Sequence, residues 1–174
     1  MGFGQESHVY VEKMRAELEG LERQGVVLVG NAFSPILVVK GEPGPAEMSG
    51  GALLSGADGK ALRAAFTKLG YAPEEWCGLA CWRLDGGFLA PSQMRLVLAA
   101  LGPSTVVAAD EAAAALMSDA YTGTPLELGW GRVSMVAGMR VLSLGGFEAA
   151  LGDMHSKQRM WALLKLIPPL AEPY

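Results

Sequence analysis

The sequence predicts an α/β domain of three layers, an α/β/α sandwich in which helices cover both faces of a mostly parallel central sheet. Short β-branched segments alternate with helix-favouring segments along the chain, which is the order of a parallel sheet with crossover helices. The strand segments are continuously apolar, as expected of strands that are buried on both faces. The chain has 174 residues, so we assign residues 1–174 to a single domain.

The first half of the chain is expected to contain two helices and three strands. The opening segment is polar and helix-favouring with a loose apolar stripe, and Gly25 stops it. Asp58 is expected to cap the second helix, which Gly70 closes. The expected helices span residues 6–23 and 58–69, and the expected strands span residues 26–29, 36–39 and 76–82.

The second half is expected to contain three helices and three strands. Pro91 suits the first position of a helix, where its missing N–H is not needed. Asp110 is expected to cap the next helix. The expected helices span residues 91–101, 111–117 and 156–167, and the expected strands span residues 105–108, 133–137 and 140–144.

The composition excludes several classes of protein. Hydrophobic residues make up 51% of the chain and charged residues 18%, which excludes a disordered chain. No apolar run reaches the length of about 18 residues that a membrane span needs, and the polar N-terminus lacks a signal-peptide core. We therefore expect a soluble, cytoplasmic protein with no membrane partner.

The charge and the cysteines argue against a dedicated duplex binder and against a metal protein. The net charge is −4, whereas phosphate recognition usually requires a basic excess or stripe. The densest basic group is Lys157, Arg159 and Lys165. Cys77 and Cys81 are too few for a four-thiolate site. We expect them to be half-buried thiols in a strand, and we expect no metal and no cofactor.

Ligands of parallel sheets bind outside the carboxyl ends of the strands, so the loops after the strands are the places to search for function. The loop over residues 41–56 is rich in glycine and carries Glu42 and Glu47. These two carboxylates could orient a water or stabilise a cation; the alternative is that both are solvated loop acids. Further along, His155 follows the exit loop that contains Gly145. It could act as an acid, a base or a hydrogen-bond donor, or it could be a surface residue of the last helix.

Three stretches of the sequence carry a resemblance. They are RQGVVLVGN over residues 23–31, ILVVKGEPG over residues 36–44 and KQRMWALLKLI over residues 157–167. In this order, and with the glycine spacing from Pro43 to Gly59, the chain resembles the uracil-DNA glycosylase superfamily, closest to its iron–sulfur-containing bacterial and archaeal branch. The likeness runs from about residue 14 to residue 167. It implies a three-layer domain for DNA repair that flips a base from DNA and hydrolyses its glycosidic bond at the strand exits.

The resemblance also implies roles for individual positions. Glu42 and Glu47 match the carboxylates that position water, although the loop around Gly41, Pro43 and Gly44 lacks one residue of the family pattern, an alanine between Glu42 and Pro43. The pocket positions that stack on uracil, read its edge and supply the family histidine fall at Leu54, Cys77 and Gly145. None of these three side chains can do what the family's residue does.

The positions of the family's iron–sulfur ligands are also changed. Cys81 remains, but the other three fall at Met14, Glu17 and Val97, so the resemblance predicts no cluster.

Three hypotheses remain open at this point. The first is a glycosylase-like domain with a degenerate active site, repurposed to bind nucleic acid, a nucleotide or another partner. The second is an active DNA glycosylase of altered base specificity that uses Glu42 and Glu47 and recruits His155. The third is a protein-interaction module with no nucleic-acid role. DNA or a nucleobase-containing ligand is therefore one expected partner, and a protein is the other.

Overall fold

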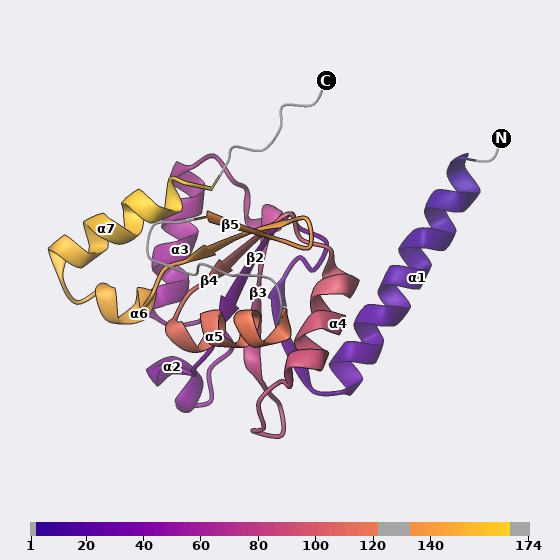
Figure 1. Cartoon of the computed structure of the whole chain (residues 1–174), viewed down its shortest axis with the longest axis horizontal. Coiled ribbons are helices and arrows are strands. Elements are labelled where there is room, and N and C mark those ends of the chain that lie inside the picture. The colour runs from indigo at the N-terminus through magenta and orange to yellow at the C-terminus, as the bar shows by residue number, and fades with distance from the viewer. Residues whose placement is uncertain (1–2, 122–132, 168–174) are drawn as a thin grey trace.

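Six strands form one mixed sheet in the computed structural model, which describes residues 3–121 and 133–167 (Figure 1). The strands span Val26–Gly30 (β1), Ile36–Lys40 (β2), Trp76–Arg83 (β3), Thr105–Ala108 (β4), Val133–Val136 (β5) and Met139–Ser143 (β6). They lie in the order β1-β3-β2-β4-β6-β5. The four central strands are parallel to one another, whereas the edge strands β1 and β5 pair antiparallel with β3 and β6.

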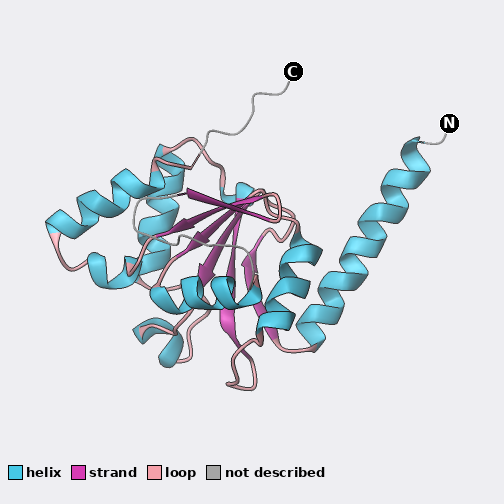
Figure 2. Ribbon diagram, in the orientation of Figure 1, coloured by secondary structure: helices cyan, strands magenta, loops and turns pink. Residues whose placement is uncertain are grey.

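Helices pack on both faces of this sheet (Figure 2). The α-helices span Phe3–Arg23 (α1), Pro45–Met48 (α2), Ala57–Lys68 (α3), Pro91–Leu101 (α4), Glu111–Ala120 (α5), Phe147–Ala150 (α6) and Met154–Leu164 (α7), and a 3-10 turn spans Pro73–Glu75. Helices α1, α4 and α5 pack on one face, and α3, α6 and α7 pack on the other. The chain is thus an α/β structure, compatible with an α/β/α sandwich.

The alternation of side chains along each strand divides the core into two clusters. In β2, Leu37 and Val39 join the cluster under α4 and α5, and Ile36 and Val38 join the cluster under α3 and α7. By the same alternation the next residue, Lys40, lies on the side of α3 and α7. This period of two is what brings a charged side chain into the α3–α7 layer at the end of an apolar strand.

The N-terminal half of α1 extends away from the body of the molecule (Figure 1). Leu21, in the last turns of the helix, is buried against the sheet, whereas Val9 and Tyr10 are each 65% exposed. None of the described helices is long and apolar enough to cross a membrane.

Most of the expected elements are confirmed, with shifts of a few residues at their ends. The mostly parallel sheet is confirmed for the four central strands, and the expected strands on either side of Gly138 pair with each other as β5 and β6. The antiparallel pairing of β1 with β3 is an addition. Helix α5 continues to Ala120, beyond the expected end at residue 117, and α7 begins at Met154 rather than at residue 156. Pro91 begins α4 and Asp110 caps α5 through the N–H of Ala113, as predicted.

Three local expectations were wrong. Gly56, not Asp58, is the N-cap of α3, because the Asp58 carboxylate is directed into the core instead. Two single-turn helices, α2 and α6, lie in segments that were expected to be irregular loops. Cys77 and Cys81 are fully buried at 2% and 3% exposure rather than half-buried. Burial, reinforced by the charge of Asp110, raises the pKa of Cys81 to about 12, so this thiol stays protonated at neutral pH.

Candidate functional site at the carboxyl ends of the strands

A buried lysine occupies the carboxyl end of β2. Lys40 is 2% exposed, and its Nζ lies 2.7 Å from Glu47 Oε1, 2.6 Å from Asp58 Oδ2 and 3.1 Å from Glu148 Oε2. An ammonium group has three N–H donors and no acceptor, so three carboxylates satisfy it completely. We call these four side chains the Lys40 cluster.

Backbone N–H groups donate to two of the three carboxylates of the cluster. Glu47 lies in α2, where its Oε1 also accepts from Leu54 N at 3.1 Å and its Oε2 accepts from Gly44 N at 3.1 Å. Asp58, in the first turn of α3, accepts from Gly59 N at 2.8 Å. The Glu47 and Asp58 side chains are only 4% and 3% exposed, whereas that of Glu148 in α6 is 32% exposed.

The electrostatics of the cluster keep its central pair charged. Burial by itself would lower the pKa of Lys40, but the hydrogen bonds to Asp58, Glu47 and Glu148 outweigh it and hold that pKa above the usual lysine range. Burial would likewise raise the pKa of Glu47, and the hydrogen bond from Lys40 together with backbone N–H groups lowers it below its ordinary value. Proton transfer from Lys40 to Glu47 is therefore opposed on both sides.

The carboxylate of Asp110, outside the Lys40 cluster, fixes the loop that follows β2. Asp110 accepts from Gly41 N at 3.0 Å and from Glu42 N at 3.1 Å, and it also caps α5. A Cβ at position 41 would lie 2.3 Å from Asp110 Oδ1 and 2.4 Å from Ala113 N. Only glycine allows the loop to approach α5 this closely.

The same loop also presses against α6. A Cβ at Gly44 would lie 2.3 Å from Glu148 Oε2, so the absence of a side chain at position 44 leaves room for the Glu148 carboxylate beside Lys40. The two glycines that begin and end the GEPG segment thus each make way for a carboxylate from a different helix.

A cavity of about 350 Å³ lies beside the Lys40 cluster. Pro43, Leu62 and Phe147 contribute apolar walls. Its charged lining consists of one lysine and four carboxylates, which are Lys40, Glu42, Asp58, Asp110 and Glu148. This excess of negative charge disfavours a phosphate group in the cavity.

The positive charge among the charged side chains that line the cavity is that of the Lys40 ammonium. Among the described residues, no group of three or more His, Cys, Asp and Glu side chains is arranged to hold a metal ion.

The structure brings only part of the predicted site together. Glu42 is exposed and lines the cavity together with Pro43, whereas Glu47 does not line it and is bonded to Lys40. Gly41 and Gly44 shape the loop, as described above. The other predicted pocket residues lie elsewhere; these are Leu54, Cys77, Gly145 and His155.

Leu54 and Cys77 are core residues. Leu54 is 1% exposed and packs against Gly78 of β3, with a backbone φ of 56°. Cys77 pairs with Leu37 in the sheet, three positions before Lys40 on β2, and it lies in the core on the α4–α5 face. Neither side chain lines the cavity beside Glu42.

Gly145 and His155 do not line the cavity. Gly145 is buried with φ 80° and lines a smaller depression next to α7. His155 is exposed near the start of α7 and does not line the cavity that Glu42 borders. The structure therefore does not bring an imidazole to the two loop carboxylates.

Sequence reasoning missed Lys40 and Glu148, and it took Asp58 and Asp110 only as helix caps. One signal was available, because Lys40 directly follows the apolar run ILVV and precedes a glycine. A charge that continues a buried strand must find partners. Which acids they are could not be read from the sequence.

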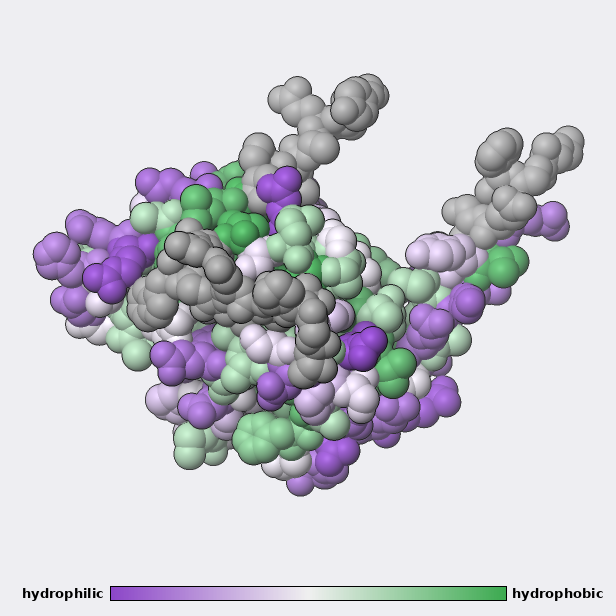
Figure 3. Space-filling model, viewed as in Figure 1, coloured by the Kyte–Doolittle hydropathy of each residue, from purple (hydrophilic) through white to green (hydrophobic). Residues whose placement is uncertain are grey.

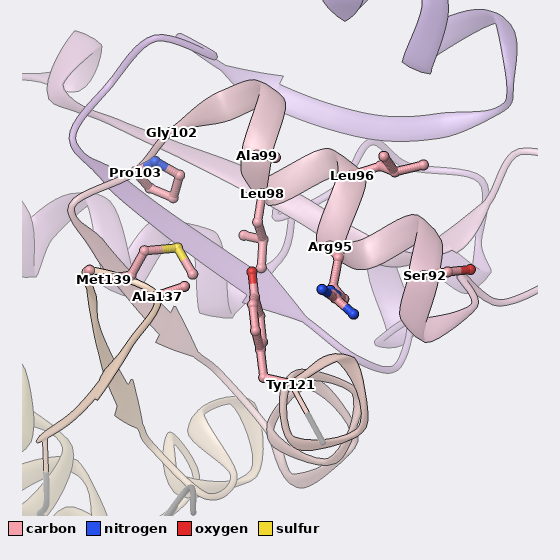
Figure 4. A pocket seen from close by; sticks show the side chains of 11 residues that line it. Ser92, Arg95, Leu96, Leu98, Ala99, Gly102, Pro103, Tyr121, Ala137 and Met139 are labelled. Carbon is pink, nitrogen blue, oxygen red and sulfur yellow. The ribbon is translucent and has the colours of Figure 1, made fainter. Parts of the chain in front are cut away.

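Another cavity lies at the opposite end of the sheet. It measures about 770 Å³ and is lined by α4 and by the segments that precede β4 and β6 (Figure 4). The Arg95 guanidinium lies 5.9 Å from the centre of the Tyr121 ring there. Its place at the amino ends of the strands separates it from the Lys40 cluster.

No protein-family model matches the chain, and no curated protein matches it in sequence. The resemblance to the uracil-DNA glycosylase superfamily therefore stays a prediction.

Proposed function

We propose that this chain is a uracil-DNA glycosylase-like domain that does not excise uracil and instead serves as a binding domain. The observation that carries the proposal is the state of Glu47. This carboxylate, which the resemblance makes a candidate for positioning water, is closed off by Lys40 and two backbone N–H groups. Both of its carboxylate oxygens already accept hydrogen bonds from within the protein.

Glu47 is also a poor base for chemical reasons. General base catalysis is most effective when the pKa of the base lies near the working pH. The hydrogen bond from Lys40 instead lowers the pKa of Glu47, which moves it further from neutral pH. A buried carboxylate with a depressed pKa has little tendency to take a proton from water.

Glu42 is the only loop carboxylate of the predicted pair that solvent reaches. Its backbone N–H is bonded to Asp110, but no described residue donates a hydrogen bond to its side chain. A catalytic carboxylate has to be oriented to be effective. Nothing among the described side chains orients this one.

The positions to which the resemblance assigns base recognition do not line the cavity. Stacking on an aromatic ring contributes about 1–3 kcal/mol per base, and the matching position, Leu54, is buried in the core. The loss of one donor to a developing oxyanion costs about 10²–10³ in rate, and the matching position, Gly145, carries no side chain. These losses combine with an acidic cavity to favour a binding role over uracil excision.

The test is an excision assay on uracil-containing single- and double-stranded DNA at low and moderate salt. We expect no abasic sites above background with the full chain. The matched variants are Glu42→Gln in the loop and Glu12→Gln on α1. Abasic sites that form with the wild type and with Glu12→Gln, but not with Glu42→Gln, would show that the domain is an active uracil glycosylase.

The alternative of an active glycosylase with another base specificity rests on one observation, the cavity that Glu42 borders. The same assay on oligonucleotides with damaged bases decides between the two. Cleavage of any such base that depends on Glu42 replaces the binding proposal with this one.

A further inference from the structure

A second concave surface lies between α3 and α7, on the outer side of the helix layer. This α3–α7 groove measures about 640 Å³. Its α3 wall is made by positions 57, 60, 61, 64, 65 and 68, and its α7 wall by positions 157, 160, 161 and 164. Both sets have the spacing of a single helix face. The groove is therefore bounded by two helix faces along its length.

The two walls differ in size. The α3 wall carries small side chains, among them Ala61, Ala64 and Ala65, whereas the α7 wall carries Met160 and Trp161. Small residues allow another backbone to approach closely, and a half-buried tryptophan is a common anchor of protein interfaces. Nine of the twelve described residues that line the groove are apolar.

The other three lining residues are lysines. Lys60 and Lys68 lie on α3 and Lys157 lies on α7, and all three are exposed. In the part of the chain that the structure describes, no carboxylate pairs with any of them. Lys165 adds a fourth positive charge, with its Nζ 5.3 Å from the Trp161 ring centre. Hydrophilic side chains gather over α7 in Figure 3. A chain of net charge −4 thus concentrates unpaired positive charge here.

We infer that the α3–α7 groove docks an acidic amphipathic helix of a partner protein. Apolar grooves between helices accept a third helix through anchors at i, i+3, i+4 and i+7. The α3 wall from Ala57 to Lys68 is about 16 Å long at 1.5 Å per residue, which matches a helix of three turns. Lys60 and Lys68 are about 12 Å apart along α3 and fit acids two turns apart on the partner.

A protein helix fits these walls better than a nucleic acid does. Single-stranded nucleic acids bind along a basic track with successive stacking rings. The groove offers the ring of Trp161 beside alanine and aliphatic side chains, and the second ring that lines it, Phe147, is buried at 3% exposure. The apolar lining supplies affinity for a helix. Lys60, Lys68 and Lys157, which we call the rim lysines, favour an acidic helix over a basic one.

The inference rests on the proposed binding function and names a surface and a partner class for it. The two can fail separately. Uracil excision is measured on DNA and depends on Glu42, whereas helix docking is measured on a peptide and depends on α3 and α7.

The experiment selects peptides against the full chain. A yeast-displayed library of 16-residue helices varies one face among apolar residues and the flanking positions among Glu, Asp, Lys and Ser. We expect enrichment of acidic helices with apolar residues at i, i+3 or i+4, and i+7. One enriched sequence is then synthesised, and its binding is measured by fluorescence anisotropy at two salt concentrations.

Variants of the groove locate the binding. The double variant Lys60→Glu/Lys68→Glu and the groove-filling variant Ala64→Gln should each weaken the peptide by about tenfold or more. Lys13→Glu, the matched change on α1, should leave its affinity unchanged. Circular dichroism and thermal melting confirm that each variant folds.

Four results would each overturn the inference. They are the absence of any enriched helix, the enrichment of basic helices, a peptide affinity that the groove variants leave unchanged, and a self-association of the chain that the groove variants abolish. Binding of a fluorescent oligothymidylate that is lost in Lys60→Glu/Lys68→Glu would likewise replace the helix with a nucleic acid.

Discussion

The Lys40 cluster and the α3–α7 groove lie on the same side of the sheet and use lysine in opposite ways. Lys40 gives all three of its N–H groups to Glu47, Asp58 and Glu148 inside the protein. The rim lysines, such as Lys60, face solvent, and no carboxylate of the described residues pairs with them. The contrast separates charge that holds the fold together from charge that remains available to a partner. Glu47 is the carboxylate to which the resemblance gives a catalytic role, and its oxygens already accept hydrogen bonds from within the protein.

The sharpest test of this contrast is to remove the buried ammonium. Lys40→Met leaves three carboxylates without their cation, and breaking a buried ion pair in this way costs about 3–5 kcal/mol. Urea denaturation should show this loss in the free energy of unfolding. The matched exposed change, Lys13→Met on α1, should cost less than about 0.5 kcal/mol. Equal effects of the two changes would refute a structural role for the cluster.

A smaller effect is expected from Glu47→Gln, and it should depend on pH. Hydrogen bonds to charged groups contribute about 1.5–3 kcal/mol, so the variant should lose about this much at neutral pH. Because the folded-state pKa of Glu47 lies below its ordinary value of 4.5, its contribution is complete above that value and is lost as the pH falls through the lowered pKa.

The pH dependence gives an independent measurement of the same contact. In denaturation curves between about pH 6 and pH 3, the wild type should lose stability more steeply than Glu47→Gln, and the two curves should converge in acid. Parallel curves would show that Glu47 does not gain its stability from the charged form.

A change of similar or smaller size is expected at Gly59. A Cβ there would lie 1.7 Å from Leu54 O, and the backbone N–H of Leu54 donates a hydrogen bond to Glu47. Gly59→Ala should cost about 1–3 kcal/mol through the displacement of that loop. The control is Gly20→Ala on α1, where a Cβ meets nothing within 4 Å; this change should stabilise the helix by up to about 1 kcal/mol.

The smallest effect on stability is expected at the groove. Lys60→Glu/Lys68→Glu should change the free energy of unfolding by no more than about 0.5 kcal/mol, because neither lysine pairs with a carboxylate in the part of the chain that the structure describes. A loss as large as that of Lys40→Met would mean that the rim lysines also hold the fold together, and it would contradict the contrast between Lys40 and the rim lysines.

The sequence was sufficient for the long elements and insufficient for the site. Periodicity and end signals located the strand Thr105–Ala108 and the helix Pro91–Leu101 because local preferences and burial agree there. The four-residue helices α2 and α6 were not predicted, since a single turn has no periodicity to detect. Expectations based on the family placed Leu54 and Cys77 in a pocket, but alternation along β3 and the packing of the loop against α3 direct both into the core.

The Lys40 cluster itself could not be predicted because its contacts are distant along the chain. Asp58 lies 18 residues beyond Lys40, and Glu148 lies near the other end of the sequence. Each acid carries a local signal of its own, that of a residue in the first turn of a helix. Only the tertiary arrangement of α2, α3 and α6 turns three helix-start acids into partners of one lysine.

The spread of these acids along the chain has a consequence during synthesis. Glu47 and Asp58 follow Lys40 closely, whereas Glu148 leaves the ribosome several seconds after Asp58 at a rate of about 5–20 residues per second. The third acid therefore becomes available to the Lys40 ammonium only after the segment that follows β6 has been synthesised. Glu148 is the last of the three partners of Lys40 to be made.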